Sequence, residues 1–253
     1  MKTFTFFNQK GGVGKTTLII LFAAYLRYHL GFRVKVIDFQ APDPQVEFFR
    51  KLDLKNAARS GSFLANFLGR RDRLEPYPIE AVGKPANEYA DNDLEALVMK
   101  INEEVKRDQY DYLLLDFPGE YSKKTPISYL IRYHLLDGLY IPFSTEPQEY
   151  SDAFKHGVTF KQMHQPCRLM WYRLSESYLK NKADALDEAD RGLSEYGLEV
   201  SKVRIRAFNK ATESSEVRCF VRNTLCWPDR YVKMVCPELI PLFEEIVQFL
   251  DSV

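Results

Sequence analysis

Short apolar segments alternate with longer segments of helical period along most of the chain. The apolar runs are typical of strands that a sheet buries on both faces, and the periodic segments are typical of the helices that cover such a sheet. The predicted strands are residues 3–7, 33–38, 112–116, 138–142, 168–172 and 203–208. The predicted helices are residues 15–29, 46–69 with a break at 60–62, 92–107, 126–136, 150–163, a charged stretch that ends at 196, and 237–250. This alternation predicts an α/β fold with a doubly wound, mostly parallel sheet flanked by helices.

The chain is expected to form one domain over residues 1–253, because its length and its 45% hydrophobic content suffice for one packed core. Residues 70–92 interrupt the alternation: charged residues come first, and three prolines and a glycine follow. Such residues are typical of turns and loops. We therefore predict a surface excursion near 70–92 and no domain boundary.

The first predicted strand runs into a glycine-rich turn before the first predicted helix. The turn reads Asn8-Gln9-Lys10-Gly11-Gly12-Val13-Gly14-Lys15-Thr16-Thr17. In a P-loop, backbone N–H groups at a helix N-terminus bind phosphates, glycines allow close approach, a lysine neutralises phosphate charge, and the next hydroxyl binds Mg²⁺. Gly14, Lys15 and Thr16 have this order. The ordinary pattern has a glycine where this chain has Gln9, and Lys10 follows.

Residues 8–17 resemble the deviant Walker-A motif of the ParA/MinD family, and most closely that of ParA-type partition ATPases. The resemblance implies a P-loop NTPase fold and an ATP site made of Lys10, Gly11, Gly12, Val13, Gly14, Lys15, Thr16 and Thr17. In this family the lysine at the position of Lys10 reaches the nucleotide of the partner subunit, where it acts as an arginine finger does. Lys10 and Lys15 are therefore predicted to be catalytic, in a homodimer that forms with ATP.

Two predicted strands end in an acid. Asp116 resembles the Walker-B acid of the family, and Asp38 resembles the first acid of its Asp-x-Asp-Pro-Gln segment. The resemblance predicts Mg²⁺ as a cofactor beside ATP, held by Thr16, Asp116 and Asp38. Gly119 stands where the family has the second proline of Asp-x-Pro-Pro, which predicts a looser switch loop.

The second acid of that segment, which positions the attacking water in the family, is displaced in this chain. Gln40 occupies its place, and Asp43-Pro44-Gln45 repeats the end of the pattern three residues later. Either an insertion makes Asp43 the water-positioning group, or Gln40 orients the water as glutamine does in some GTPases. We prefer Asp43 as the third catalytic residue. The expected activity is slow, partner-stimulated hydrolysis of ATP to ADP and phosphate, with a hydrolysis-poor ATP-binding module as an alternative.

Basic residues are concentrated late in a chain whose charges cancel overall, at 35 Lys+Arg against 35 Asp+Glu. Lys202, Arg204 and Arg206 would share one face of the predicted strand 203–208. They could bind phosphates, or they could be the solvated face of an edge strand. The resemblance favours DNA, because ATP-bound ParA dimers often bind DNA through C-terminal basic residues.

The resemblance thus predicts non-specific DNA binding, and the DNA-binding residues are predicted to be Lys202, Arg204, Arg206, Arg218 and Arg222. A ParB-like activating protein is the expected protein partner. The expected role is segregation or positioning of a plasmid, chromosome or mobile element. Adenine contacts are expected in the loops near residues 172–174 and 208–211, where Asn209 is a weak candidate.

Other function classes fit the sequence less well. A MinD-like membrane switch needs a basic amphipathic C-terminal helix, but residues 237–253 carry four acids and no Lys or Arg, so that helix is expected to pack on the sheet. A MinD-like or orphan positioning ATPase with a protein partner stays open. The four cysteines lack C-x-x-C spacing, which argues against zinc and cluster carriers. Reduced thiols and no recognisable signal peptide predict a cytoplasmic protein, nucleoid-associated if it binds DNA.

Overall fold

One six-stranded sheet organises the chain. The structure is a computed structural model that describes residues 1–59, 75–82, 84, 88–107, 109–207, 223–227 and 229–253. The strands are β1 (Lys2–Phe6), β2 (Val34–Asp38), β3 (Ile79–Ala81), β4 (Tyr112–Asp116), β5 (Gly138–Phe143) and β6 (Cys167–Trp171). They lie in the order β3-β2-β4-β1-β5-β6, and every pair is parallel. The predicted fold class is confirmed.

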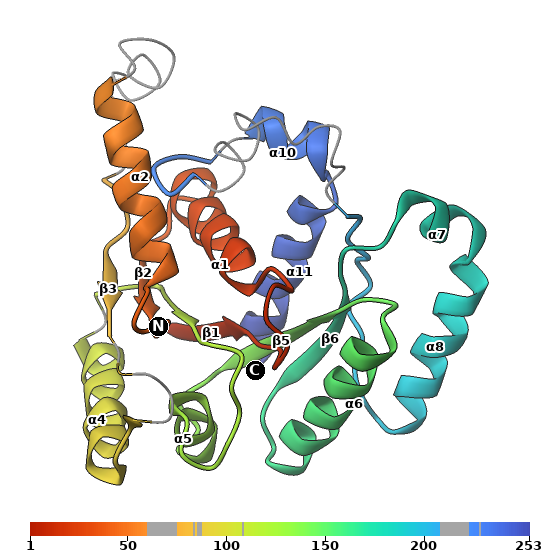
Figure 1. The fold of residues 1–253 in the computed structure, drawn as a ribbon, viewed down its shortest axis with the longest axis horizontal. Coiled ribbons are helices and arrows are strands. Elements are labelled where there is room, and N and C mark those ends of the chain that lie inside the picture. Colours follow the sequence, from red (N-terminus) through yellow and green to blue (C-terminus); the bar gives the residue numbers. More distant parts are fainter. Residues whose placement is uncertain (60–74, 83, 85–87, 108, 208–222, 228) are drawn as a thin grey trace.

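Helices cover both faces of this sheet (Figure 1). The helices on one face are α1 (Lys15–Ala24), which continues as the π-helix η1 (Tyr25–His29), α2 (Gln45–Arg59), α10 (Asp229–Val235) and α11 (Leu239–Ser252). The helices on the other face are α4 (Asp91–Arg107), α5 (Pro126–Arg132), α6 (Pro147–Gln162) and α8 (Ala183–Glu195), with the short α7 (Glu176–Asn181) leading into α8. Each face therefore has its own hydrophobic core, as in a doubly wound fold.

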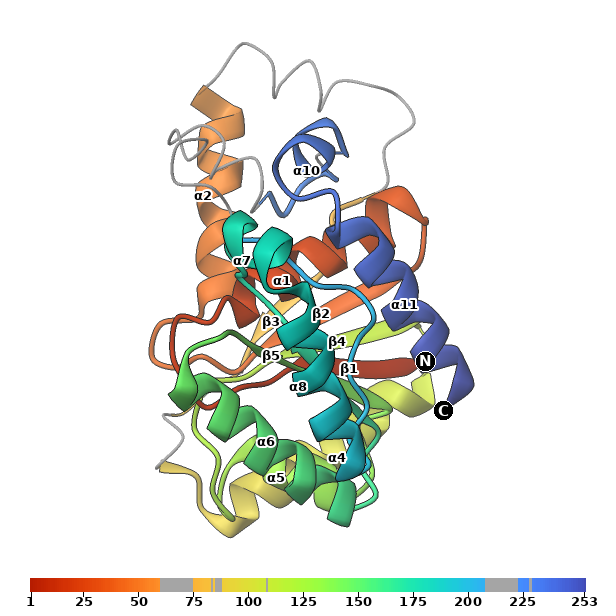
Figure 2. The ribbon, with the colours of Figure 1, turned by 90° about the vertical axis from the view of Figure 1, so that its right-hand side faces the viewer.

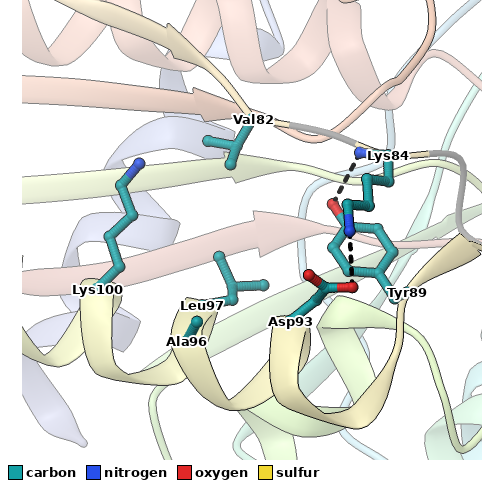
Figure 3. A pocket seen from close by; sticks show the side chains of 7 residues that line it. All are labelled: Val82, Lys84, Tyr89, Asp93, Ala96, Leu97 and Lys100. Atoms are coloured by element: carbon teal, nitrogen blue, oxygen red, sulfur yellow. Dashed lines mark hydrogen bonds and ion pairs between the residues drawn. The ribbon is translucent and has the colours of Figure 1, made fainter.

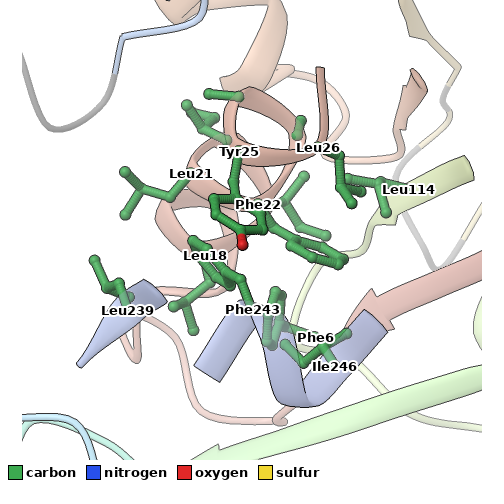
Figure 4. Close-up of a cluster of buried hydrophobic side chains, with 14 of the residues drawn as sticks. Phe6, Leu18, Leu21, Phe22, Tyr25, Leu26, Leu114, Leu239, Phe243 and Ile246 are labelled. Atoms are coloured by element: carbon green, nitrogen blue, oxygen red, sulfur yellow. The ribbon is translucent and has the colours of Figure 1, made fainter. Parts of the chain in front are cut away.

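The alternation of side chains along the strands assigns residues to the two cores. Phe4 and Phe6 of β1 and Leu114 of β4 face α1 and α11, where Phe22 and Phe243 have ring centroids 5.2 Å apart (Figure 4). α11 buries its apolar face here, as predicted for the C-terminal helix. The two chain ends lie side by side (Figure 2), where the Nζ of Lys2 donates to the carbonyl oxygen of Val253 at 3.0 Å.

Two local predictions were wrong. Residues 79–81 of the predicted excursion form β3, an edge strand that pairs with β2 and is too short to show a pattern. Residues 203–208 form no regular strand within the described part, which ends at 207, because the chain beside β6 makes only two isolated bridges, at Val200 and Arg206. Between them the Ser201 hydroxyl accepts the Val203 N–H at 3.1 Å, and this local bond competes with a strand ladder.

The strand order has a topological switch point between β1 and β4. The helix after β1 lies on one face of the sheet, and the helix after β4 lies on the other face. Such a reversal leaves a gap at the carboxyl ends of the two neighbouring strands, where α/β proteins bind their ligands. Residues 8–17 and Asp116 both lie at this edge.

Candidate nucleotide-binding site

The glycine-rich turn connects β1 to α1 with a backbone that suits phosphate binding. Gly12 and Gly14 have φ values of 74° and 91°, in the left-handed region that other residues rarely adopt. Gly14 precedes α1, and no side chain caps the first turn of that helix. The N–H groups at the start of α1 are therefore presented to a ligand, with the favourable end of the helix dipole behind them.

Asn8 and Lys15 hold the shape of this turn. The buried Asn8 side chain donates to the carbonyl of Pro142 at 2.8 Å and accepts the Lys10 N–H at 2.8 Å, so it ties the turn to β5. Lys15 is also buried, and its Nζ donates to the carbonyl oxygen of Lys10 at 3.0 Å. Burial lowers the pKa of the Lys15 ammonium, although the charge of Asp116 opposes this. Burying an ammonium group without a charged partner is unfavourable, and an anion bound beside Lys15 would reduce this cost.

Thr16, Asp116 and Gln40 meet directly beside the turn. The Thr16 hydroxyl donates to Oδ2 of Asp116 at 2.8 Å, and Nε2 of Gln40 lies 2.6 Å from the Thr16 hydroxyl oxygen and 2.8 Å from the same Oδ2. The other oxygen of Asp116, Oδ1, is buried and accepts no hydrogen bond from the described residues. Burial, and secondly the charge of Asp38, raise the pKa of Asp116 to about 7. A hydroxyl and a carboxylate with a free buried oxygen are ligands that suit Mg²⁺.

Asp38 and Asp43 differ in their surroundings. Both oxygens of Asp38 accept backbone N–H groups, from Gln40 at 3.0 Å and from Val46 at 2.6 Å, so Asp38 ties the loop after β2 to the start of α2. Burial raises the pKa of Asp38. The side chain of Asp43 is exposed, and its carbonyl accepts from Gln45 at 3.1 Å. The structure thus brings Gln40, and not Asp43, to Thr16 and Asp116.

Lys10 has two acidic partners that the sequence analysis did not identify. Its Nζ pairs with the carboxylates of Glu146 and Glu149 at the start of α6, at 2.9 Å for Glu149. The hydrogen bonds that Lys10 donates to Glu146 and Glu149 raise the pKa of its ammonium. Glu149 is buried, whereas about a third of the Lys10 side chain is exposed (36%). The only sign of this ion pair in the sequence is that Glu146 and Glu149 lie just before the predicted helix 150–163.

Tyr172 and Arg173, which follow β6, lie against the turn. A Cβ at Gly14 would lie 2.8 Å from the hydroxyl of Tyr172, so any other residue there would force the tyrosine side chain to shift. Arg173 has a left-handed φ of 62°, and its guanidinium donates to the carbonyl of Gly12 at 3.2 Å. The predicted adenine loop at 172–174 therefore lies at the nucleotide site, while 208–211 with Asn209 falls outside the described residues.

Gly119 brings the loop after β4 against the phosphate-binding turn. A Cβ at this position would lie 2.2 Å from the carbonyl oxygen of Gln9, a backbone atom that cannot move aside cheaply. This glycine permits an approach that a side chain would prevent, and the looser loop stays a prediction.

The predicted DNA-binding residues are partly neutralised. Arg204 pairs with Asp187 and Asp190 of α8, both at 2.6 Å, and Arg206 pairs with Glu238 at 2.5 Å. Lys202 is exposed. Arg218 and Arg222 lie outside the described residues, so their part of the prediction stays a prediction.

A separate pocket of about 320 Å³ lies between α4 and the end of β3 (Figure 3). The Nζ of Lys84 pairs there with Asp93 at 2.8 Å, and the N–H of Lys84 donates to the Tyr89 hydroxyl at 3.4 Å. Lys100, at the other end of the pocket, pairs with Glu80. The cations that line it are thus already compensated, and no part of the phosphate-binding turn reaches it.

The described residues do not form several other kinds of site. No described helix is long and apolar enough to cross a membrane. Outside the gaps, no three His, Cys, Asp or Glu side chains gather as a metal site. Among the described cysteines, Cys167, Cys226 and Cys236 are not joined by disulfide bonds, and Cys219 falls outside the described residues.

Comparisons with known proteins agree with this geometry. The sequence profile of the "CobQ/CobB/MinD/ParA nucleotide binding domain" matches residues 4–170. The chromosome-partitioning ATPase Soj of Treponema pallidum is 35% identical over 127 residues, which are 46% of this chain and 48% of that protein. The chain thus spans about half the length of the curated relatives that it matches.

Two solved structures have the same fold over nearly the whole chain. The MinD cell division protein of Aquifex aeolicus superposes with a TM-score of 0.63 at 19% identity, covering 98% of this chain and 97% of that one. The structure described as pNOB8 ParA bound to nonspecific DNA superposes with a TM-score of 0.51 at 19% identity, covering 99% of both chains. These likenesses show the fold, and the profile matched over residues 4–170 establishes that the chain belongs to the CobQ/CobB/MinD/ParA nucleotide-binding domain family.

Proposed function

We propose that this protein is a ParA-type ATPase switch. It binds ATP with Mg²⁺, forms a homodimer, binds DNA without sequence preference, and leaves the DNA when the ATP is hydrolysed. This cycle would segregate or position a plasmid, chromosome or mobile element, with a ParB-like protein as activator. One observation carries the proposal: a partly exposed Lys10 lies beside a phosphate-binding site formed by Lys15, Thr16 and Asp116.

The residues at this site fit an ATP–Mg²⁺ complex. The N–H groups of residues 11–17 and the ammonium of Lys15 would bind the phosphates. Thr16 and Asp116 would hold Mg²⁺, which neutralises phosphate charge during hydrolysis. The buried Oδ1 of Asp116, which has no partner among the described residues, supports this assignment. Asp38 would contribute mainly by holding the loop after β2, since backbone N–H groups already occupy both of its oxygens.

The position of Lys10 supports the proposed homodimer. Its ammonium is held by Glu146 and Glu149 at the edge of the site, and its side chain is partly exposed. An exchange of these acids for the phosphates of a partner subunit would let ATP drive dimerisation. It would also place positive charge where the transition state develops negative charge. ATP binding and association are then one coupled equilibrium.

DNA binding rests on the family membership and on the DNA-bound relative named above. Among the predicted residues, Lys202 has an exposed side chain, whereas Arg204 and Arg206 are paired with acids. A phosphate contact by Lys202 costs little, while a contact by either arginine requires an ion pair to break. A Lys202→Glu variant is therefore expected to weaken DNA binding and its salt dependence more than Arg206→Gln does.

The decisive experiment measures DNA binding at low and moderate salt with ATP, ADP or no nucleotide, for the wild type and Lys10→Ala. Light scattering follows dimerisation in the same samples. ATP should promote both dimers and salt-sensitive DNA binding, and Lys10→Ala should change that response. Dimers that ignore DNA would overturn the DNA part and favour a positioning ATPase with a protein partner. ATP binding without phosphate release, with or without DNA, would favour a hydrolysis-poor module.

A further inference from the structure

Gln40 occupies the position at which the family resemblance predicts an acid, and its side chain contacts two of the proposed Mg²⁺ ligands. Its amide nitrogen lies 2.6 Å from the Thr16 hydroxyl oxygen and 2.8 Å from Oδ2 of Asp116. The Thr16 hydroxyl and the Asp116 carboxylate are the two groups proposed to hold Mg²⁺. The backbone N–H of Gln40 donates to Oδ1 of Asp38 at 3.0 Å, and this bond holds the backbone of Gln40 in place.

The surroundings favour a neutral side chain at this position. Asp38 and Asp116 lie opposite each other in the register of β2 and β4, and both are buried. A third carboxylate at position 40 would add charge repulsion to a site that already disfavours charge when no cation is bound. An amide avoids this repulsion and can still donate and accept hydrogen bonds.

We propose that Gln40, and not Asp43, is the residue that positions the attacking water, and that its amide is free for this task when Thr16 and Asp116 serve as Mg²⁺ ligands. The inference rests on the proposed ATPase function. In the free protein the N–H groups of Gln40 bind the Thr16 and Asp116 oxygens. With Mg²⁺ held by Thr16 and the Asp116 carboxylate, the Gln40 amide would lose these partners and would be available beside the bound γ-phosphate.

The amide supports hydrolysis without exchanging a proton. Its carbonyl oxygen accepts a hydrogen bond from the water, as glutamine does in some GTPases. The water oxygen bonds to the γ-phosphorus, and the bond to the bridging oxygen breaks, with its electron pair going to ADP. The water proton passes to the phosphate product. Gln40 orients the water, and it is therefore a positioning residue.

The test compares Gln40→Ala, Asp43→Ala and the matched control Gln248→Ala, an exposed glutamine on α11. Gln40→Ala should lower kcat by about 10- to 100-fold with little change in KM for ATP, because orientation is lost and binding is kept. Asp43→Ala and Gln248→Ala should keep the wild-type rate. Gln40→Asp should recover part of the rate at saturating Mg²⁺, because it restores the acid of the family. A rate that falls with Asp43→Ala and not with Gln40→Ala overturns the inference.

A second measurement does not depend on hydrolysis. Binding of a fluorescent ATP analogue is titrated with Mg²⁺ for the same variants. Gln40→Ala should lower the Mg²⁺ concentration at half-saturation by about three- to tenfold, because hydrogen bonds that compete with the ion are removed. Asp43→Ala should leave it unchanged. An unchanged value for Gln40→Ala overturns the inference. If the wild type binds but never hydrolyses ATP, the proposed function fails while this titration still decides the role of Gln40.

Discussion

Replacing Asp116 by asparagine is expected to stabilise the nucleotide-free protein, and to do so more at higher pH. The carboxyl is fully buried, and burial together with the charge of Asp38 raises its pKa to about 7. A carboxyl whose pKa is higher in the folded chain than in the unfolded chain binds more protons when folded. Its contribution to stability is therefore complete below the unfolded pKa and is lost as the pH rises toward 7.

The magnitude follows from the difference between the two pKa values. The ordinary value is 3.8, and the shift is about three units, each equivalent to about 1.36 kcal/mol. Ionising Asp116 in the folded protein thus costs up to about 4 kcal/mol above pH 7. Between about pH 5 and pH 8 the cost grows by about 3 kcal/mol. The Asp116→Asn variant carries no charge at this position and escapes the cost.

The assay is urea unfolding of wild type and Asp116→Asn without Mg²⁺, at about pH 5 and pH 8. The difference in the free energy of unfolding should increase with pH in favour of the variant. Asp251→Asn, at an exposed position on α11, is the control and should show no such trend. Adding Mg²⁺ and ATP should stabilise the wild type and not the Asp116 variant. A difference that is the same at both pH values would refute the argument from buried charge.

The remaining predictions concern packing and a buried polar contact. Gly119→Ala places a Cβ 2.2 Å from the Gln9 carbonyl oxygen and should lower the free energy of unfolding by about 1–3 kcal/mol. The control is Gly192→Ala in α8, where an added Cβ would meet no atom within 4 Å, and it should raise the free energy of unfolding by up to about 1 kcal/mol. Equal effects of the two substitutions in thermal unfolding would contradict the close approach at Gly119. Asp53→Ala leaves the N–H and hydroxyl of Thr224 without their acceptor, which Oδ2 provides at 2.8 and 2.7 Å, and should cost about 1–3 kcal/mol in urea unfolding. A cost near zero would mean that water replaces the carboxylate.

The parts of the fold that were predictable are those in which local pattern and burial agree. The apolar run 112–116 is buried on both faces as β4, and α1 is apolar all round because the sheet, α2 and α11 enclose it. The phosphate-binding turn was predictable for a similar reason. Glycines with left-handed φ and a lysine at a helix start have few other uses in that order.

The parts that were not predictable depend on contacts between distant residues. Lys10 and Glu149 are 139 positions apart, and no local pattern indicates that they pair. Arg204 and Arg206 looked like a free basic face, but α8 and Glu238 supply acids to both. The spacing around 38–45 could not decide between Gln40 and Asp43, because the path of the loop depends on Asp38 bonding Val46.

Helix α2 connects the nucleotide site to the segment 223–227, and this connection has an observable consequence. Its first turn is fixed by Asp38, and one to two turns later Asp53 binds the Thr224 N–H and Arg50 donates to the Thr224 hydroxyl oxygen at 2.9 Å. A packed helix moves as a unit. If ATP–Mg²⁺ binding shifts the loop after β2, α2 must therefore either move Thr224 with it or break its hydrogen bonds to Thr224. Hydrogen exchange of the Thr224 amide should therefore change when ATP and Mg²⁺ bind, and Asp53→Ala should abolish that change while leaving ATP binding intact. An amide that exchanges at the same rate with and without nucleotide would mean that α2 does not transmit the shift.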